Sequence, residues 1–138
     1  MIDFVNVKKA YPNGTMALRG INLHIDDGEF VFIVGHSGAG KTTLMKLLLR
    51  EEKVSSGKLT VGDYDLSQMS SFKVPYYRRE LGVVFQDFRL FPKKTVYENV
   101  AFAMEVIHRT PRSIKRHVPQ ALSLVGISDK ADRYPDEL

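Results

Sequence analysis

The sequence of 138 residues predicts an α/β fold in which a part built from strands and one helix is followed by a helical part. Three observations predict this arrangement. Residues 1 to about 85 carry strand patterns separated by turns, a glycine-rich loop stands between an apolar run and an amphipathic helix, and residues 95–138 have helical periodicity. One domain at most is expected, because domains commonly contain ~100–150 residues.

Alternating side chains predict the strands at the N-terminus. Residues 2–7 alternate apolar with polar side chains, and after a turn at residues 12–14 a similar alternation covers residues 18–25. We expect these segments to be half-buried antiparallel strands, with one more short strand at residues 58–61.

Two unbroken apolar runs predict strands of another kind. Residues 30–34 and 81–85 have few polar side chains, a pattern typical of parallel strands that are buried on both faces. Between these runs, residues 43–49 place leucines on one face of a predicted helix.

The last third of the chain predicts two helices. Apolar residues recur at helical spacing over residues 96–107. Thr110 and Pro111 then form a typical helix start, and Gly126 a typical helix end. Pro119 falls inside this second helix and is expected to kink or divide it.

The composition excludes several classes of protein. The chain is 43% hydrophobic and 26% charged, as in globular rather than disordered proteins. The absence of cysteine excludes a disulfide scaffold and a cysteine-ligated zinc site. No apolar run approaches the ~20 residues that cross a bilayer, and the first residues do not resemble a secretory signal, so we expect a cytoplasmic protein.

The net charge of +4 is spread evenly along the chain. Residues 1–85 contain 11 Lys or Arg against 9 Asp or Glu, and residues 86–138 contain 9 against 7. This distribution argues against a dedicated nucleic-acid-binding face. Anionic lipid or an acidic partner is one possible contact of a local run of cations, but the sequence alone favours the solvated face of a helix. The run comprises Arg109, Arg112, Lys115 and Arg116.

The strongest functional motif is Gly-His-Ser-Gly-Ala-Gly-Lys-Thr at residues 35–42, which matches the pattern of a phosphate-binding loop. Its position between an apolar run and a helix is the context that this motif requires. The glycines allow backbone N–H groups to turn toward a phosphate, and the helix directs its positive end at the same anion. Lys41 can reach the β- and γ-phosphates, and the Thr42 hydroxyl is a suitable oxygen ligand for Mg²⁺.

Two residues outside the loop are further candidates. Tyr11 could stack on an adenine ring, although an isolated tyrosine at a strand end more often belongs to the core or its rim. Gln86 follows the second apolar run, where α/β folds place ligands, and its side-chain oxygen could contact Mg²⁺ or the attacking water.

These motifs together resemble the nucleotide-binding subunit of ABC transporters. An aromatic residue some two dozen positions before Gly-His-Ser-Gly-Ala-Gly-Lys-Thr-Thr, and then Val-Phe-Gln, carry the resemblance. Residues 84–92 and 95–102 are similar to the bacterial cell-division members of the family. The resemblance implies a P-loop NTPase core of the ABC ATPase type with N-terminal antiparallel strands and an α-helical subdomain, divided into residues 1–86 and 87–138.

The resemblance also implies roles for individual residues. Tyr11 would stack on adenine, Lys41 and Gln86 would serve catalysis, and Thr42 with Gln86 would bind Mg²⁺. The residues that would bind ATP are Tyr11, Gly35, His36, Ser37, Gly38, Ala39, Gly40, Lys41, Thr42 and Thr43.

By the same resemblance, the partners would be a second full-length copy, arranged head to tail, and a membrane-embedded permease subunit that holds the protein at the inner face of the cell membrane. The family's signature Leu-Ser-Gly-Gly, the apolar strand that ends in its catalytic Asp-Glu, and its switch histidine have no match in residues 1–138. We therefore expect the chain to be part of a protein of roughly 220 residues and to bind nucleotide without hydrolysing it.

Other functions stay open at this level. The ATPase of a lipoprotein or macrolide exporter would share the same motifs, a P-loop phosphotransferase would share the phosphate loop, and a nucleotide-gated interaction module would bind ATP without using it for work. Four apolar residues after Gln86 could pack on their own domain or form a docking patch for the membrane partner. They are Phe88, Leu90, Phe91 and Pro92.

Overall fold

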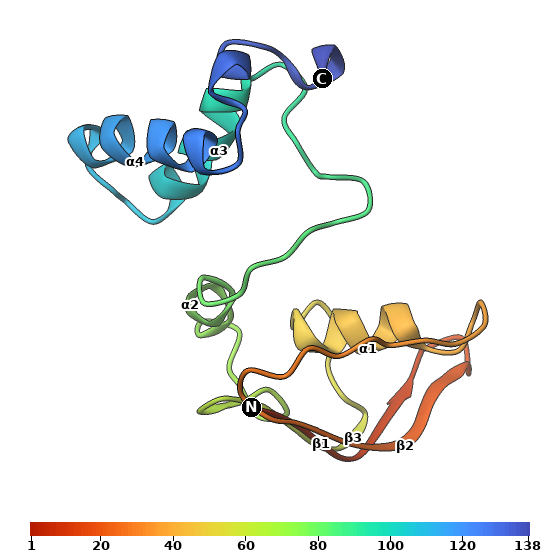
Figure 1. Cartoon of the computed structure of the whole chain (residues 1–138). Coiled ribbons are helices and arrows are strands. Elements are labelled where there is room, and N and C mark those ends of the chain that lie inside the picture. Colours follow the sequence, from red (N-terminus) through yellow and green to blue (C-terminus); the bar gives the residue numbers. More distant parts are fainter. The chain divides into compact units, whose positions relative to one another are not determined.

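The computed structural model describes residues 1–138 and divides them into two compact units, Met1–Gly82 and Val83–Leu138 (Figure 1). The first unit holds the strands and the glycine-rich loop, and the second holds the two long helices of the C-terminal part.

A four-stranded antiparallel sheet forms the base of the first unit. Its strands are β1 (Ile2–Ala10), β2 (Met16–Ile25), β3 (Ser56–Val61) and β4 (Tyr64–Asp65), in the order β2-β1-β3-β4. The central strand β1 pairs antiparallel with both β2 and β3, which confirms the antiparallel strands predicted at the N-terminus. The β1–β2 connection is a tight hairpin, closed by hydrogen bonds from Tyr11 N to Thr15 O and from Gly14 N to Tyr11 O, both 2.9 Å long.

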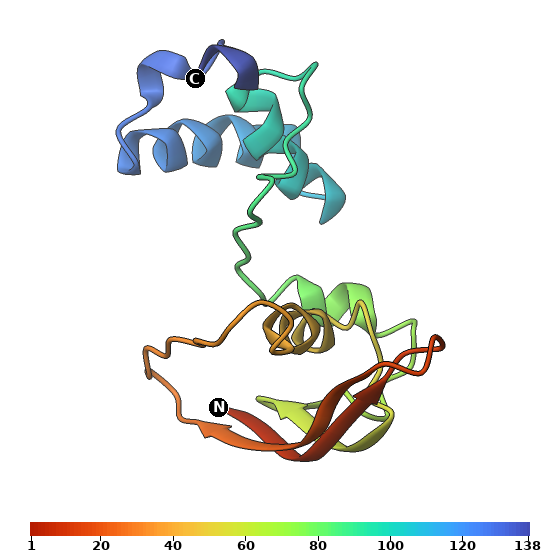
Figure 2. The same ribbon diagram turned by 90° about the vertical axis from the view of Figure 1, so that its right-hand side faces the viewer.

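Helix α1 (Lys41–Leu48) lies over one face of this sheet, as Figures 1 and 2 show from two sides. Leu44 and Leu47 of the helix are buried in one core with Phe4, Val7 and Leu59 of the sheet. Full burial of a leucine side chain contributes about 1.5–3 kcal/mol, so this contact fixes the helix on the sheet.

The short helix α2 (Val74–Arg78) closes the same core. Its Tyr77 side chain is only 1% exposed, and its hydroxyl donates a 2.6 Å hydrogen bond to the carbonyl oxygen of Leu48. Burial raises the pKa of Tyr77 to about 12. The phenol is therefore neutral at physiological pH and ties α2 to the end of α1.

The second unit is built on α3 (Val96–Val106) and α4 (Pro111–Leu124), followed by the 3₁₀ turns η1 (Ser128–Lys130) and η2 (Pro135–Glu137). Thr95 begins α3 with a complete capping box, since its side chain accepts from Glu98 N and the Glu98 side chain accepts from Thr95 N. Val118 and Leu122 of α4 are buried in one cluster with Val96 and Ala101 of α3.

Pro119 does not divide α4, so of the two expected effects, a kink or a division, the division is wrong. The helix continues from Pro111 to Leu124 with Pro119 inside it. Val118 and Leu122, on either side of the proline, are 0% and 3% exposed. Packing on both sides of the proline therefore outweighs the loss of one backbone hydrogen bond.

The two predicted buried strands are also wrong. Residues 30–34 and 81–85 form no strand and pair with no neighbour in residues 1–138. Phe30, Val34 and Val84 are 84%, 86% and 92% exposed. A β-strand requires a hydrogen-bonded neighbour, so an apolar run without such a neighbour stays irregular. None of the helices combines the length and the apolar character needed to cross a membrane.

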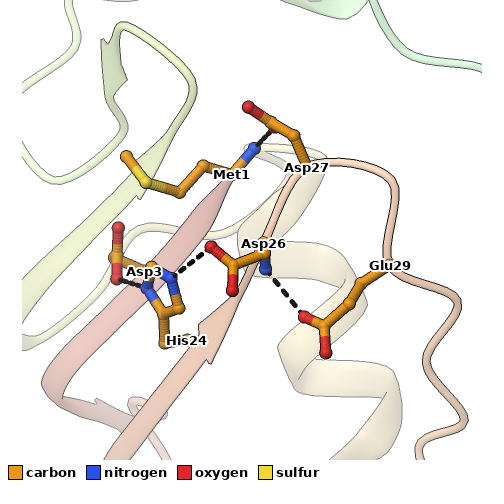
Figure 3. Close-up of polar contacts among 6 residues, drawn as sticks. All are labelled: Met1, Asp3, His24, Asp26, Asp27 and Glu29. Atoms are coloured by element: carbon orange, nitrogen blue, oxygen red, sulfur yellow. Dashed lines mark hydrogen bonds and ion pairs between the residues drawn. The ribbon is translucent and has the colours of Figure 1, made fainter.

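Charged groups join the open ends of β1 and β2 (Figure 3). His24 of β2 lies opposite Asp3 of β1 in the strand register and contacts both Asp3 and Asp26 through its ring nitrogens. The amino group of Met1 pairs with Asp27. The hydrogen bonds that the His24 ring donates, first to Asp3 and then to Asp26, raise the pKa of His24 above its ordinary value of 6.5.

These contacts predict a pH-dependent term in the stability of the first unit. A histidine whose pKa is higher in the folded state than in the unfolded state stabilises the fold fully below its unfolded pKa of 6.5. This stabilisation is lost as the pH rises through the folded-state pKa. The difference in free energy of unfolding between the wild type and His24→Gln should therefore shrink as pH rises, which urea titrations at several pH values measure. His36→Gln removes a histidine that contacts only the Ser37 carbonyl and is the control. A difference that is independent of pH would contradict the assignment.

Candidate phosphate-binding site

The glycine-rich loop is tied to the sheet at its last residue. Gly40 is the N-cap of α1 and adopts a left-handed conformation, with φ of 90°. A Cβ atom at this position would lie 2.8 Å from Leu18 Cδ2 and 2.9 Å from the Ala17 carbonyl oxygen. Only glycine satisfies both the dihedral angle and this close approach to β2. The loop and the start of α1 are thereby held beside the β1–β2 hairpin.

The first turn of α1 has the electrostatic character of an anion site. Gly40 has no side chain to cap the helix, and the first turn contains no acidic residue. The first N–H groups of a helix have no partner within the helix and carry the positive end of its dipole. In α1 no side chain at the N-cap occupies these donors, so they suit a phosphate.

Lys41 folds back over the loop. Its Nζ donates hydrogen bonds of 2.5 Å to the Gly35 carbonyl and 2.8 Å to the His36 carbonyl. An ammonium group has three N–H donors, so one donor stays available while the other two hold the loop. Lys41 can thus shape the loop and contact an anion from the same position.

A cavity of about 600 Å³ lies where the loop meets the β1–β2 hairpin. This volume is within the range of ~300–1,000 Å³ that is usual for small-molecule sites. Its walls come from the hairpin turn on one side and from the loop and the first turn of α1 on the other. They are formed by Tyr11, Thr15, Met16, Ala17, Ser37, Gly38, Ala39, Gly40, Lys41, Thr42 and Thr43.

Tyr11 is fixed at the edge of this cavity. Its hydroxyl lies 3.3 Å from Thr43 Oγ1, and the ammonium group of Lys9 lies 5.1 Å from the centre of its ring. Lys9 also forms a 2.6 Å ion pair with Glu52, which lowers the pKa of that carboxyl group. The ring of Tyr11 is therefore held by a hydrogen bond at its tip and by a cation near its face.

The structure brings most of the sequence-predicted residues together and adds three. Tyr11 and residues 37–43 line the cavity, whereas Gly35 and His36 contribute the carbonyl groups that hold Lys41. Gln86 belongs to the second unit, where it is exposed at the start of a turn.

Thr15, Met16 and Ala17 were missed by the sequence reasoning. They directly follow the turn that begins at Tyr11, so the hairpin itself was the signal that could have identified them.

Comparison with known proteins identifies a consistent set of relatives. Residues 18–138 match the family model described as ABC transporter. The chain is 51% identical over 138 residues to "Cell division ATP-binding protein FtsE" of Bacillus subtilis (strain 168), and 42% identical over 138 residues to the protein of that name in Escherichia coli (strain K12). The whole chain is covered in both cases, together with 60% and 62% of the relatives. The chain therefore spans about 60% of the length of the curated relatives it matches.

Solved structures show the same relationship. A dimeric post-hydrolysis state of the ATP-binding cassette MJ0796 bound to ADP and Pi matches the whole chain with a TM-score of 0.86 and 29% identity, over 63% of that protein's chain. A second structure, described as dimeric MJ0796, a bacterial ABC transporter cassette, matches with a TM-score of 0.87. This likeness confirms the predicted fold class, an α/β P-loop core with N-terminal antiparallel strands and a helical part.

The geometry of the loop predicts unequal effects of two alanine substitutions. Gly38 and Gly40 both have positive φ, 80° and 90°, but a Cβ at Gly38 would meet no atom within 4 Å. Gly38→Ala should cost about 1–2 kcal/mol of stability from backbone strain alone. Gly40→Ala should cost roughly 2–4 kcal/mol, because its Cβ atom would also clash with Ala17 and Leu18, in addition to the same backbone strain. Urea unfolding of the two variants measures the difference, and equal losses would contradict the role of Gly40 as the tie to β2.

Proposed function

The chain belongs to the ABC transporter family, and from this membership we propose that it forms the ATP-binding part of an FtsE-like ATPase that acts in bacterial cell division. One observation carries the proposal. The same cavity is lined by an aromatic ring, Tyr11, and by the phosphate loop with the first turn of α1. A nucleotide needs both kinds of surface at once, one for its base and one for its phosphates.

The residues of the cavity fit ATP in a defined orientation. The phosphates would lie against the N–H groups at the start of α1, where no acidic side chain competes for them. The remaining donor of Lys41 would contact the β- or γ-phosphate as a charge-assisted hydrogen bond. The adenine would lie over the half-buried ring of Tyr11 at the other side of the cavity.

Mg²⁺ would accompany the nucleotide and neutralise part of the phosphate charge. The exposed Thr42 lines the cavity, and its hydroxyl is the group best suited to hold the ion. In the full-length protein, Gln86 would be a second ligand, as the family resemblance implies. Mg²⁺ needs few protein ligands because it keeps water and phosphate oxygens in its shell.

In the full-length protein, Lys41 and Gln86 would serve ATP hydrolysis, coupled to a membrane-embedded permease subunit of the FtsX type and to a second copy of the ATPase. The protein would lie at the cytoplasmic face of the membrane through that permease subunit. The names of the relatives and the dimeric cassettes among the solved structures support this assignment. We propose that residues 1–138 bind ATP without turning it over, because they contain no apolar strand that ends in the family's catalytic Asp-Glu and no match to its signature loop.

The loop after Gln86 would contain the docking patch for the permease subunit. Phe88 is 72% exposed and adopts a left-handed conformation with φ of 54°, a strained arrangement for a bulky residue. Phe91 differs, since its ring packs edge-to-face on Phe102 at 4.6 Å and its backbone is held by Asn99. Phe88 is therefore the better candidate for partner contact, and Phe91 contributes to the packing of the loop on α3.

The role of Lys41 predicts a loss of nucleotide affinity on its removal. Lys41→Ala should weaken Mg-ATP binding roughly ten- to a hundredfold, because a charge-assisted contact contributes ~1.5–3 kcal/mol. Isothermal titration calorimetry measures the affinity, and circular dichroism verifies that the variant is folded. Lys46→Ala removes a cation from the last turn of the same helix and is the matched control. Equal affinities of the wild type and Lys41→Ala would remove the basis of the proposal.

The role of Tyr11 predicts that ligands with and without a base respond differently. Tyr11→Ala should weaken ATP binding about five- to a hundredfold, since stacking of a base on an aromatic ring contributes ~1–3 kcal/mol. Binding of inorganic triphosphate should change little. Tyr11→Phe keeps the ring and loses only the hydrogen bond to Thr43, so it should retain most of the ATP affinity. If Tyr11→Ala weakened both ligands equally, adenine stacking would be excluded.

A further inference from the structure

Four exposed cations gather around the start of α4, in a part of the chain that the nucleotide site does not use. Arg109 lies in the turn before the helix, and the other three lie in its first two turns. No acidic residue occurs between Glu105 and Asp129. We call this set the basic cluster: Arg109, Arg112, Lys115 and Arg116.

The side chains of the basic cluster have no partners within the protein. The structure describes every residue of the chain, and none of these four side chains takes part in an ion pair, a side-chain hydrogen bond or a contact with an aromatic ring. Other cations of the same unit are paired, since Lys130 contacts Asp129 and Arg133 contacts Glu137. The cluster is thus a local excess of positive charge and not part of a network.

The arrangement of the cluster opposes the stability of its own helix. Arg112 and Lys115 are three residues apart and Arg112 and Arg116 are four apart, spacings at which like charges on a helix repel. They also stand near the N-terminus of α4, where the helix dipole favours acidic residues, and the first turn has none. Neither packing nor helix stability explains the cluster, so we look for its role in binding.

We propose that the basic cluster binds the anionic surface of a phospholipid membrane. Val118 and Leu122 of α4 are buried against α3, whereas Arg112, Lys115 and Arg116 are all exposed. The three cations are one, three and four residues apart, so they lie on neighbouring positions of the helix surface. A plane of lipid headgroups can meet all of these cations at once, and clusters of four to eight such cations beside a membrane are typical of anionic-lipid binding. The choice of a membrane over another polyanion rests on the proposed function, which brings the chain to a membrane partner.

Binding to vesicles tests this proposal. The chain is titrated with vesicles of phosphatidylcholine containing one-third phosphatidylglycerol, and with vesicles of phosphatidylcholine alone. Binding should require phosphatidylglycerol and weaken as salt is raised. A cation near such a surface strengthens binding about fivefold, so Arg112→Gln with Lys115→Gln and Arg116→Gln should weaken it about a hundredfold.

A second triple variant separates the cluster from net charge. Arg19→Gln with Lys58→Gln and Lys73→Gln removes the same charge from exposed positions of the first unit and should change vesicle affinity much less. The double variant Arg112→Lys with Arg116→Lys keeps the positive charge and should still bind the anionic vesicles. Its binding would show that substitution at these positions does not by itself unfold the protein. Equal losses in the two Gln triples, or no phosphatidylglycerol dependence, would overturn the proposal.

Two further polyanions complete the experiment. If polyglutamate or a duplex RNA bound more tightly than the anionic vesicles, and bound through the basic cluster, the membrane assignment would be overturned in favour of that partner class. The ATP affinity of every variant is measured in parallel. Vesicle binding without ATP binding would refute the proposed function alone, and ATP binding without vesicle binding would refute the membrane contact alone.

Discussion

The close approach of Gly40 to the backbone of β2 is the constraint on which the site depends. It fixes where α1 begins, and therefore where the unpaired N–H groups of its first turn lie. Because β2 follows directly from the turn that carries Tyr11, the same approach brings an aromatic ring and the uncapped start of α1 to one cavity. The burial of Leu44 and Leu47 against the sheet then holds the rest of the helix in this position. The site thus follows from one glycine contact and one amphipathic helix.

The sequence predicted those parts of the fold that depend on local chemistry. Alternation in β1 and β2, the turn between them, the capping threonine of α4 and the glycine-rich loop all carry their information within a few residues. Residues 30–34 and 81–85 failed as predictions because an apolar run reports burial by distant neighbours, and no strand in residues 1–138 pairs with them. The expected division of α4 at Pro119 failed for the related reason that the burial of Val118 and Leu122 outweighs a local breaking signal. Tyr11 and residues 37–43 of the candidate site line one cavity, because the loop motif specifies backbone geometry directly. The hairpin wall at Thr15–Ala17 could be identified only from the tertiary structure.

The charges of the two units serve different purposes. In the first unit, cations and anions close the structure on itself, as Lys9 does with Glu52 and His24 with two aspartates. In the second unit, the start of α4 keeps four cations without partners, at a cost to the helix that carries them. The cavity at the glycine-rich loop in one unit, and the basic cluster and the strained backbone at Phe88 in the other, agree with the proposal of an ATP-binding protein that contacts a membrane partner.

A crystal structure of the chain with Mg²⁺ and a non-hydrolysable ATP analogue decides whether one cavity binds both the adenine and the phosphates of ATP. The adenine should stack on Tyr11, and the phosphates should lie against the first turn of α1. The Lys41 ammonium group should lie about 2.7–2.9 Å from a β- or γ-phosphate oxygen. Phosphates bound away from the start of α1, or an adenine that does not contact Tyr11, would contradict this binding mode.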